Sequence, residues 1–416
     1  ADRDPALSAR TLERAIAEQA GPNAAYAPDG VYPEGPMYWA YGTTFEVILI
    51  SLLEHSFGTD YGLAAAPGFL ASADYLTQVT APSGRYFNYA DAREFVPPRP
   101  VLHWFAQKRG QPQIAAPELH RLAGQAQPIE GELQGIYERH DALALWWHRP
   151  APRSPLQAPS SPPPLAWLGH GENPVAVFRS SWDNPRATYL AIKGGSPSTS
   201  HAHMDAGSFI LEADGVRWAV DPGMQDYHTL ENAGVNLWDG AQNGARWGIF
   251  RLGPEAHNIL RFDSAPQLID GTATFTDFSP SAPSPSATLD LTPLYRDHAT
   301  SVRRKAGLLA DGRIAFQDDW TAGSAPVEVT WQFLTHADIT VEPRGVLLRQ
   351  AGETLRLRVL SPETISIKID DLSQPARPSD APNPGLRRIR ILVRTPAGQP
   401  GRLSLLAEPG SQAVNR

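Results

Sequence analysis

A proline-rich stretch between residues 149 and 164 divides this chain of 416 residues into two halves with different patterns. Proline lacks a backbone N–H and interrupts both helices and central strands, so the stretch predicts a linker or a long surface connection. Before it, apolar residues recur at helical spacing; after it, short β-type runs are bounded by glycine, proline, aspartate or asparagine. We therefore expect helices first and sheets second.

The first half is expected to form five helices. The earliest starts near a capping serine, Ser8, and a mostly apolar helix follows over about 36–55. Further helices are expected over about 67–79, 99–107 and 128–147. Apolar helices joined by short loops are typical of an α/α layer, such as part of a helical toroid.

The second half is expected to be an antiparallel β-sandwich. Strands are expected over 175–179, 187–193, 207–213, 216–220, 258–262, 327–333 and 355–359. The predicted organisation is therefore an α+β multidomain chain. Its parts are a helical domain over 1–150, a proline-rich linker over 151–165, a β-sandwich over 166–330 and a C-terminal β-sheet over 331–416.

Composition limits the kinds of site that this chain can hold. It has no cysteine, which excludes disulfides and thiolate metal sites, so a metal would need histidine, aspartate or glutamate ligands. The net charge of −8 argues against a nucleic-acid partner. The longest apolar run, from Val47 to Leu53, is too short for a membrane span, so no membrane insertion is expected. Because Ala1 has no signal peptide before it, we expect either a removed leader or a fragment.

The densest chemical motif is a His-x-His pair, His201 and His203. In an extended segment these two imidazoles would point to the same face, because side chains alternate along a strand. Asp221 follows 18 residues after His203, and His257 follows 36 residues later, both beside expected strands. Two imidazoles and a carboxylate suit a zinc ion with an open or water-filled fourth position. The alternative is an ordinary histidine pair on a surface or in a core.

A second candidate site lies where the segment 29–42 enters a helix. Glu34, Tyr38 and Tyr41 are spaced at i, i+4 and i+7, which places them on one helical face. Such polar-tipped side chains, with Trp39 among them, suit the wall of a sugar-binding cleft. The alternative is aromatic packing at a capped helix start.

Two further segments could contact a sugar. The loop 84–91 carries Asn88, which could bind sugar hydroxyls, although Asp91 could equally serve as a structural cap. Arg246 and Arg251 flank aromatic residues shortly before His257. Arginine beside an aromatic ring suits a carboxylated sugar, and an ordinary ion pair is the equal alternative.

These motifs together resemble the heparinase II/III-like family of polysaccharide lyases. The resemblance rests on His201 to Phe209, Gly215 to Asp221 and Ala256 to Asn258, and on Tyr32 to Tyr41, which resembles the tyrosine segment of that family's helical domain. It implies an incomplete α/α toroid followed by antiparallel β-sandwich domains. It also implies β-elimination on a uronic-acid-containing polysaccharide, glycosaminoglycan-like or alginate-like, in a secreted or periplasmic bacterial protein.

The resemblance also assigns residue roles. His203, Asp221 and His257 would bind zinc, whereas His201 would face the substrate as a catalytic group. Tyr38 would be the catalytic tyrosine, with Tyr41 as the second choice. The expected substrate-binding residues are Glu34, Trp39, Asn88, Arg246 and Arg251.

One family feature has no counterpart here. Family members carry a further asparagine or histidine, on an earlier part of the toroid, that neutralises the uronate carboxylate. The short segment before Tyr38 has no histidine, and its asparagine, Asn23, is expected in a loop, so this role is unassigned. An alternative function is therefore a non-catalytic carbohydrate-binding relative that keeps a structural zinc. A third reading, a zinc hydrolase with Asp205 as its base, is less favoured. The expected partner is an acidic polysaccharide, and a homodimer is possible.

Overall fold

The computed structural model describes residues 3–124, 139–148, 162–281 and 283–410. Within this part of the chain two compact units are formed. The helical unit consists of Ala1–Gln78, Phe95–Pro162 and Gly169–Glu172, and the β unit of Val79–Glu94, Pro163–Leu168 and Asn173–Arg416. The expected linker and the first part of the helix expected over 128–147 lie almost entirely outside the described residues. No helix among the described residues is long and apolar enough to span a membrane.

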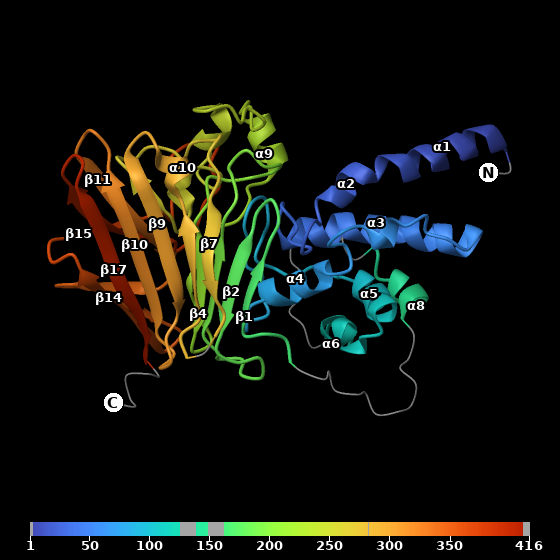
Figure 1. The fold of residues 1–416 in the computed structure, drawn as a ribbon, viewed down its shortest axis with the longest axis horizontal. Helices are drawn as coiled ribbons and strands as arrows, with labels where there is room; N and C mark the ends of the chain where they lie inside the picture. Colours follow the sequence, from blue (N-terminus) through green and yellow to red (C-terminus); the bar gives the residue numbers. More distant parts are fainter. Residues whose placement is uncertain (1–2, 125–138, 149–161, 282, 411–416) are drawn as a thin grey trace. The chain divides into compact units, whose positions relative to one another are not determined.

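The helical unit is built around one long apolar helix. Its helices are α1 (Pro5–Glu18), α2 (Ala20–Ala24), α3 (Pro36–Phe57), α4 (Ser72–Val79), α5 (Val101–Arg109), α6 (Ala116–Leu122) and α8 (Leu143–Trp147) (Figure 1). Pro36 occupies the first turn of α3, where a missing N–H costs nothing, and Gly58 ends the helix with a φ of 74°. The indole of Trp39 is fully buried, with its ring 5.8 Å from that of Phe105.

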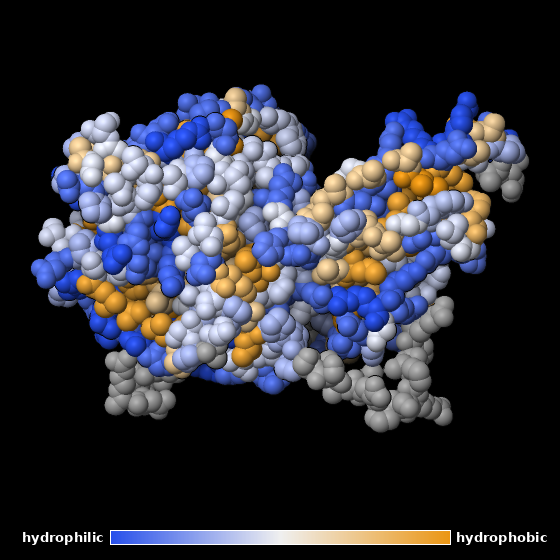
Figure 2. Space-filling model, viewed as in Figure 1, coloured by the Kyte–Doolittle hydropathy of each residue, from blue (hydrophilic) through white to orange (hydrophobic). Residues whose placement is uncertain are grey.

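Exposed apolar side chains gather on the surface of the helical unit (Figure 2). On α3 they include Phe45, Leu52 and Phe57, and on α1 they include Leu7. Apolar helix faces of this kind are typical of helices that pack in a layer. The structure confirms helices followed by antiparallel sheets, and the α/α toroid stays a prediction.

The strands of the β unit form three sheets. The five-stranded sheet has the order β1 (Ala166–Gly169), β2 (Val175–Arg179), β3 (Tyr189–Lys193), β4 (Phe209–Ala213), β5 (Val216–Ala219). The eight-stranded sheet has the order β12 (Asp338–Glu342), β13 (Gly345–Gln350), β14 (Glu353–Ser361), β17 (Pro400–Pro409), β10 (Ile314–Ala322), β9 (Ala299–Leu308), β8 (Ser286–Asp290), β7 (Thr274–Ser279). The four-stranded sheet has the order β15 (Ser366–Asp371), β16 (Arg387–Thr395), β11 (Val327–Thr335), β6 (Leu260–Phe262).

One aromatic core fills the β unit. Buried and half-buried residues alternate along β10, as expected for a strand with one face on a core. The ring of Phe209 lies 4.6 Å from that of Phe316 and 5.8 Å from that of Trp331. Arg304 is also buried here, paired with Asp318 at 2.8 Å, and donates to the backbone carbonyl of Gly207 at 2.7 Å. The hydrogen bond from Arg304 to Gly207 ties the eight-stranded sheet to the end of the loop that carries the histidines.

Two expected boundaries differ from the structure. Residues 79–94, expected in the helical domain, belong to the β unit, because Arg217 donates to the carbonyl of Tyr86 and Ser83 bonds to Glu212. Strands on both sides of the expected boundary at residue 330 share the eight-stranded sheet. The expected β-sandwich and C-terminal sheet are therefore parts of one unit. The short helices α9 (Tyr227–Asn232) and α10 (Thr292–Tyr295) also belong to it.

Candidate active site

The His-x-His pair lies on the loop between β3 and β4, not in the extended strand that the sequence suggested. His201 has a φ of 54°, in the left-handed region that residues other than glycine rarely adopt. The loop is held by hydrogen bonds from Met204 N to the Leu252 carbonyl at 2.9 Å and from Gly207 N to the Lys193 carbonyl at 2.8 Å. Backbone strain of this kind is typical of functional sites.

Both histidines meet the same carboxylate, that of Asp91. Its Oδ2 lies 3.1 Å from His201 Nδ1, and its Oδ1 lies 2.8 Å from His203 Nε2. The guanidinium of Arg246 donates to Oδ2 at 3.1 Å. Burial alone would raise the pKa of Asp91, but the hydrogen bonds from the two histidines and the charge of Arg246 hold it well below its usual value. Asp91 is therefore an ionised anchor for the loop.

Two aromatic side chains surround His201. The hydroxyl of Tyr227, at the start of α9, lies 2.7 Å from His201 Nδ1 and donates to Asp91. Its ring is nearly parallel to the imidazole, at 10° and 6.1 Å between centres. The ring of Trp238 meets His201 edge-on at 5.8 Å. Since 21% of the His201 side chain is exposed, the imidazole is oriented by buried groups and still reaches solvent.

The other predicted metal ligands lie close to His203. The rings of His203 and His257 are 5.3 Å apart, and both side chains are fully buried. His203 Nδ1 and His257 Nε2 have no hydrogen-bond partner, which is costly for buried polar atoms. Asp221 lies on the opposite nitrogen of His257, at 2.7 Å from Nδ1, and also accepts a hydrogen bond from Gly223 N at 2.8 Å.

These contacts fit a metal in part. Each histidine has a carboxylate on one nitrogen and a buried, unpartnered nitrogen on the other, which is how outer carboxylates orient metal-binding imidazoles. Burial lowers the pKa of His203, which keeps that imidazole neutral, as a metal ligand must be, whereas, against the effect of burial, the charge of Asp221 raises the pKa of His257. Asp221, however, contacts His257 instead of facing the two bare nitrogens. Among the described residues no group of three or more possible ligands is assembled.

Asp205 is part of the scaffold of this loop. It is fully buried, pairs with Lys193 Nζ at 2.5 Å and accepts a hydrogen bond from Ala90 N at 3.1 Å. Burial would raise the pKa of Asp205, but the charge of Lys193 lowers it. A base that activates water must reach that water, so these contacts leave Asp205 unsuited to the hydrolase reading.

The predicted substrate-binding residues of the β unit are buried in protein contacts. Besides Asp91, Arg246 donates to the carbonyl of Ala202 at 2.8 Å. Arg251 donates to the Asn383 side chain at 2.9 Å and to the Met224 carbonyl at 3.0 Å. Asn88 donates to the Asp221 carbonyl at 3.1 Å. For both arginines the ordinary ion-pair or hydrogen-bond role is therefore the one that their geometry supports.

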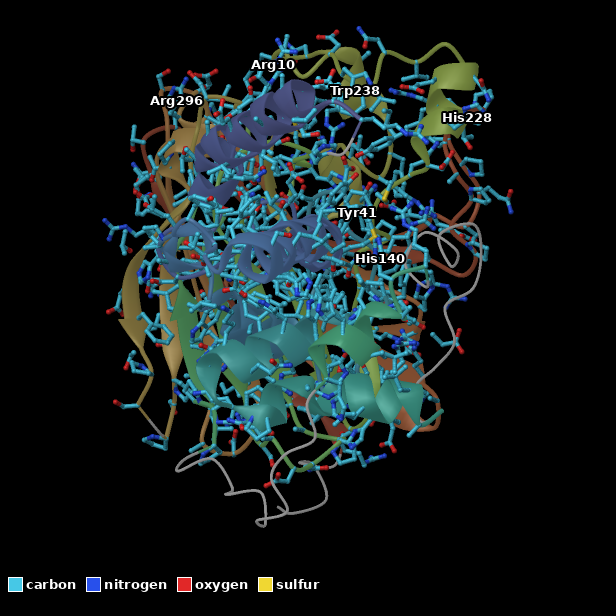
Figure 3. All side chains as sticks on the ribbon, turned by 90° about the vertical axis from the view of Figure 1, so that its right-hand side faces the viewer. Arg10, Tyr41, His140, His228, Trp238 and Arg296 are labelled. Atoms are coloured by element: carbon cyan, nitrogen blue, oxygen red, sulfur yellow. The ribbon has the colours of Figure 1, made fainter. Side chains whose placement is uncertain are left out.

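The predicted residues of the helical unit lie at the start of α3. Glu34 precedes the helix, and Tyr38 and Tyr41 occupy its first two turns, both partly exposed. The ring of Tyr41 lies 5.2 Å from that of Phe45, which in turn lies 5.2 Å from His140 (Figure 3). Trp39 faces the opposite way, into the core, so it packs against protein and not against a ligand.

Sequence reasoning missed three residues of this site. The sequence predicts Asp91 only as part of a sugar-contacting loop or as a cap, because nothing in the loop 84–91 links it to histidines more than 100 residues later. Tyr227 and Trp238 belong to no motif, and only the structure brings them to His201. The sequence around Tyr227 and Trp238 carries no signal that links either residue to the histidines.

Comparison with known structures extends over nearly the whole chain. Heparan sulfate lyase HepC from Pedobacter heparinus, studied as a mutant, gives a TM-score of 0.64 at 14% identity over 96% of this chain. A crystal structure of heparinase III gives a TM-score of 0.64 at 13% identity over 96% of this chain. At such identities the likeness shows the fold alone. This chain spans 55% and 56% of the lengths of these two structures.

Sequence comparison places the site in a known family. No curated protein matches the chain. The profile of the heparinase II/III-like C-terminal family matches residues 175–397, more than half of the sequence. The matched segment contains His201, His203, Asp221 and His257, whose contacts are given above. This chain belongs to the heparinase II/III-like family.

Proposed function

We propose that this chain is the catalytic part of a polysaccharide lyase that cleaves a uronic-acid-containing polysaccharide by β-elimination. Membership of the heparinase II/III-like family supports the reaction class. The structurally similar proteins are a heparan sulfate lyase and heparinase III, which favours a glycosaminoglycan over alginate as the substrate. The observation that carries the proposal is the geometry of His201, a partly exposed imidazole fixed by Asp91 and Tyr227.

The reaction defines what the site must supply. Elimination removes the proton from C5 beside the uronate carboxyl group, forms a double bond between C4 and C5, and expels the oxygen linked to C4. The site must therefore stabilise the negative charge that develops on the carboxyl group, accept the C5 proton and donate a proton to the leaving oxygen. No metal or redox group is required to balance these bonds.

His201 suits one of these roles. A carboxylate on Nδ1 fixes the tautomer and the orientation of the ring and stabilises the imidazolium that forms when the ring takes a proton. Asp91 holds that position here, and Tyr227 shares it. We propose that His201 accepts the C5 proton or stabilises the charge on the uronate.

The tyrosine role rests on the family resemblance. We propose Tyr38 as the group that exchanges protons with C5 and with the leaving oxygen, and Tyr41 as the alternative. Both lie in the first turns of α3. Glu34 remains the proposed sugar contact of that segment. The residue that neutralises the uronate carboxylate is unassigned.

We also propose that a zinc ion is held by His203 and His257, whose unpartnered nitrogens support this. Asp221, the third ligand that the resemblance implies, contacts His257 Nδ1 instead and would orient that imidazole. When bound, zinc would fix the loop that presents His201.

Secretion to the periplasm or medium and the formation of a homodimer stay predictions.

An ultraviolet assay tests the proposed function, because only elimination creates an unsaturated uronate that absorbs there. The chain is incubated with heparan sulfate, heparin, chondroitin, hyaluronan, alginate and glucuronan, beside His201→Ala and Tyr38→Phe. A rise in absorbance on one substrate that both variants lose establishes the lyase. Cleavage without absorbance indicates a hydrolase, and silence on every polymer favours a carbohydrate-binding relative.

A further inference from the structure

An exposed tryptophan stands beside His201. Trp238 lies in the loop after α9, and 58% of its surface is exposed, although its ring meets those of His201 at 5.8 Å and Tyr227 at 5.3 Å. Both contacts are edge-on, at 83° and 74° between the ring planes, and the exposed fraction shows that much of the indole remains uncovered. Figure 3 shows Trp238 on the loops beside the helix that carries His228.

The backbone next to Trp238 is anchored in the protein. Leu237 is fully buried in a small cluster with Leu230, Ile249 and Leu252. The guanidinium of Arg246, which pairs with Asp91, donates to the carbonyl of Leu237 at 3.2 Å. The same arginine thus links the backbone of Leu237, the residue before Trp238, to the carboxylate that orients His201. A fixed ring loses little conformational freedom when a ligand binds, which is what a binding platform requires.

An exposed indole at this place suits a sugar ring. The C–H groups of a sugar ring form an apolar face that can cover an aromatic ring, and tryptophan offers the largest such surface together with a rigid side chain. A ring lying on Trp238 would be a neighbour of a ring that reaches His201, because the two side chains are in contact.

The charges around Trp238 restrict which sugar can bind. Its Nε1 donates to Glu231 Oε1 at 3.4 Å, so a carboxylate lies at the edge of the indole. Arg246 cannot offset this carboxylate for a ligand, because it is buried and paired with Asp91. A second uronate or a sulfated sugar on Trp238 would face like charges, which weakens binding.

We propose that Trp238 is a stacking platform for an uncharged sugar residue next to the uronate that reaches His201. The proposal rests on the proposed function for its neighbouring uronate, and it names the repeat that the site selects. The selected polymer alternates a uronate with an uncharged sugar, such as an N-acetylated hexosamine. A polymer of uronates alone gains nothing from this platform.

Kinetics on two unsulfated polymers test the platform. One alternates glucuronate and N-acetylglucosamine, and the other is a glucuronate homopolymer. On the first, Trp238→Ala should raise KM about tenfold and change kcat by less than about twofold, because stacking is lost while Asp91 and Tyr227, whose hydrogen bonds orient His201, remain. Trp238→Phe should retain most of the affinity. Trp146→Ala removes a comparably exposed tryptophan from the helical unit and should leave KM unchanged.

A binding measurement separates this proposal from the lyase itself. Calorimetry with oligosaccharides of the alternating polymer is run on His201→Ala and on the double variant with Trp238→Ala. A loss of affinity on removing Trp238 supports the platform even if no elimination is found with any polymer. Equal affinity of the two variants, no binding by either, or an equal rise of KM on both polymers overturns it.

Discussion

The carboxylate of Asp91 lies 2.8 Å from Nε2 of His203, although the two residues are 112 positions apart in the sequence. The other oxygen of the same carboxylate is within hydrogen-bond distance of His201 Nδ1 and accepts a hydrogen bond from Arg246. One buried side chain therefore sets the orientation of the exposed histidine and of the buried one. A network of charged hydrogen bonds in a buried site is worth more than separate pairs, so the loop should respond strongly to its loss.

We expect Asp91→Asn to lower kcat about 100-fold or more, because a neutral amide cannot fix the His201 tautomer or stabilise its charged form. The change also leaves Arg246 without its anionic partner. Steady-state kinetics on the preferred polymer measures the effect. Asp297→Asn, at an exposed position of the same unit, is the matched control. If Asp91→Asn keeps full activity, then Asp91 has no role in orienting His201.

A buried ion pair beneath the same loop should control stability. Lys193→Met leaves Asp205 charged and fully buried without its partner, which should cost about 3–5 kcal/mol in the free energy of unfolding. Replacing both residues, by Met and Leu, should recover part of the loss. Urea unfolding measures the three proteins, with Lys305→Met at an exposed position of β9 as the control. If Lys193→Met leaves the free energy of unfolding unchanged, then Asp205 is hydrated or protonated in the variant and does not need Lys193 as its partner.

Local patterns were sufficient to predict the two structural classes. The helix expected over 36–55 is α3, and the strand expected over 175–179 is β2, because apolar runs and the turn residues that bound them act within a few positions. The membership of residues 79–94 could not be predicted in this way. It depends on the contacts of Ser83 with Glu212 and of Tyr86 with Arg217, which join residues more than 100 positions apart.

The sequence pointed to the histidines of the candidate site, but it did not reveal the residues that orient them. His201 and His203 do act on one group, but through a loop with a positive φ at His201 and not through strand alternation. Asp91 and Tyr227 reach that loop from other segments, and no spacing rule connects them with it. Residue types that suggest chemistry are local information, whereas the partners that orient them are set by the tertiary fold.

Zinc content should depend on the two histidines with unpartnered nitrogens. We expect His203→Ala and His257→Ala to abolish zinc binding, because each removes a buried ligand atom. Asp221→Asn should lower zinc affinity about 10–100-fold, as expected for a carboxylate that orients a ligating imidazole. Metal analysis by mass spectrometry and chelator titration measure these effects. His228→Ala, on exposed α9, should leave the zinc content unchanged, and a wild-type chain without zinc would refute the proposed site.

Glu46 should make the stability of the helical unit depend on pH. Burial raises its pKa from 4.5 to about 6, against the opposing hydrogen bond from Asn23, and its Oε1 has no hydrogen-bond partner. The folded state holds the Glu46 proton more tightly than the unfolded state does. The stabilisation of the folded state by this proton is therefore complete below the pKa of the unfolded chain, and it is lost as the pH rises through about 6.

Glu46→Gln removes this titration and keeps the shape of the side chain. The variant and the wild type should therefore unfold at similar temperatures near pH 4, whereas above pH 6 the variant should unfold on the order of a few °C higher. Circular dichroism at the helix band, scanned from pH 4 to pH 8, measures the difference. Glu13→Gln on the exposed face of α1 should show no such trend. A constant difference across this range would mean that Glu46 ionises at its ordinary pKa in the folded protein.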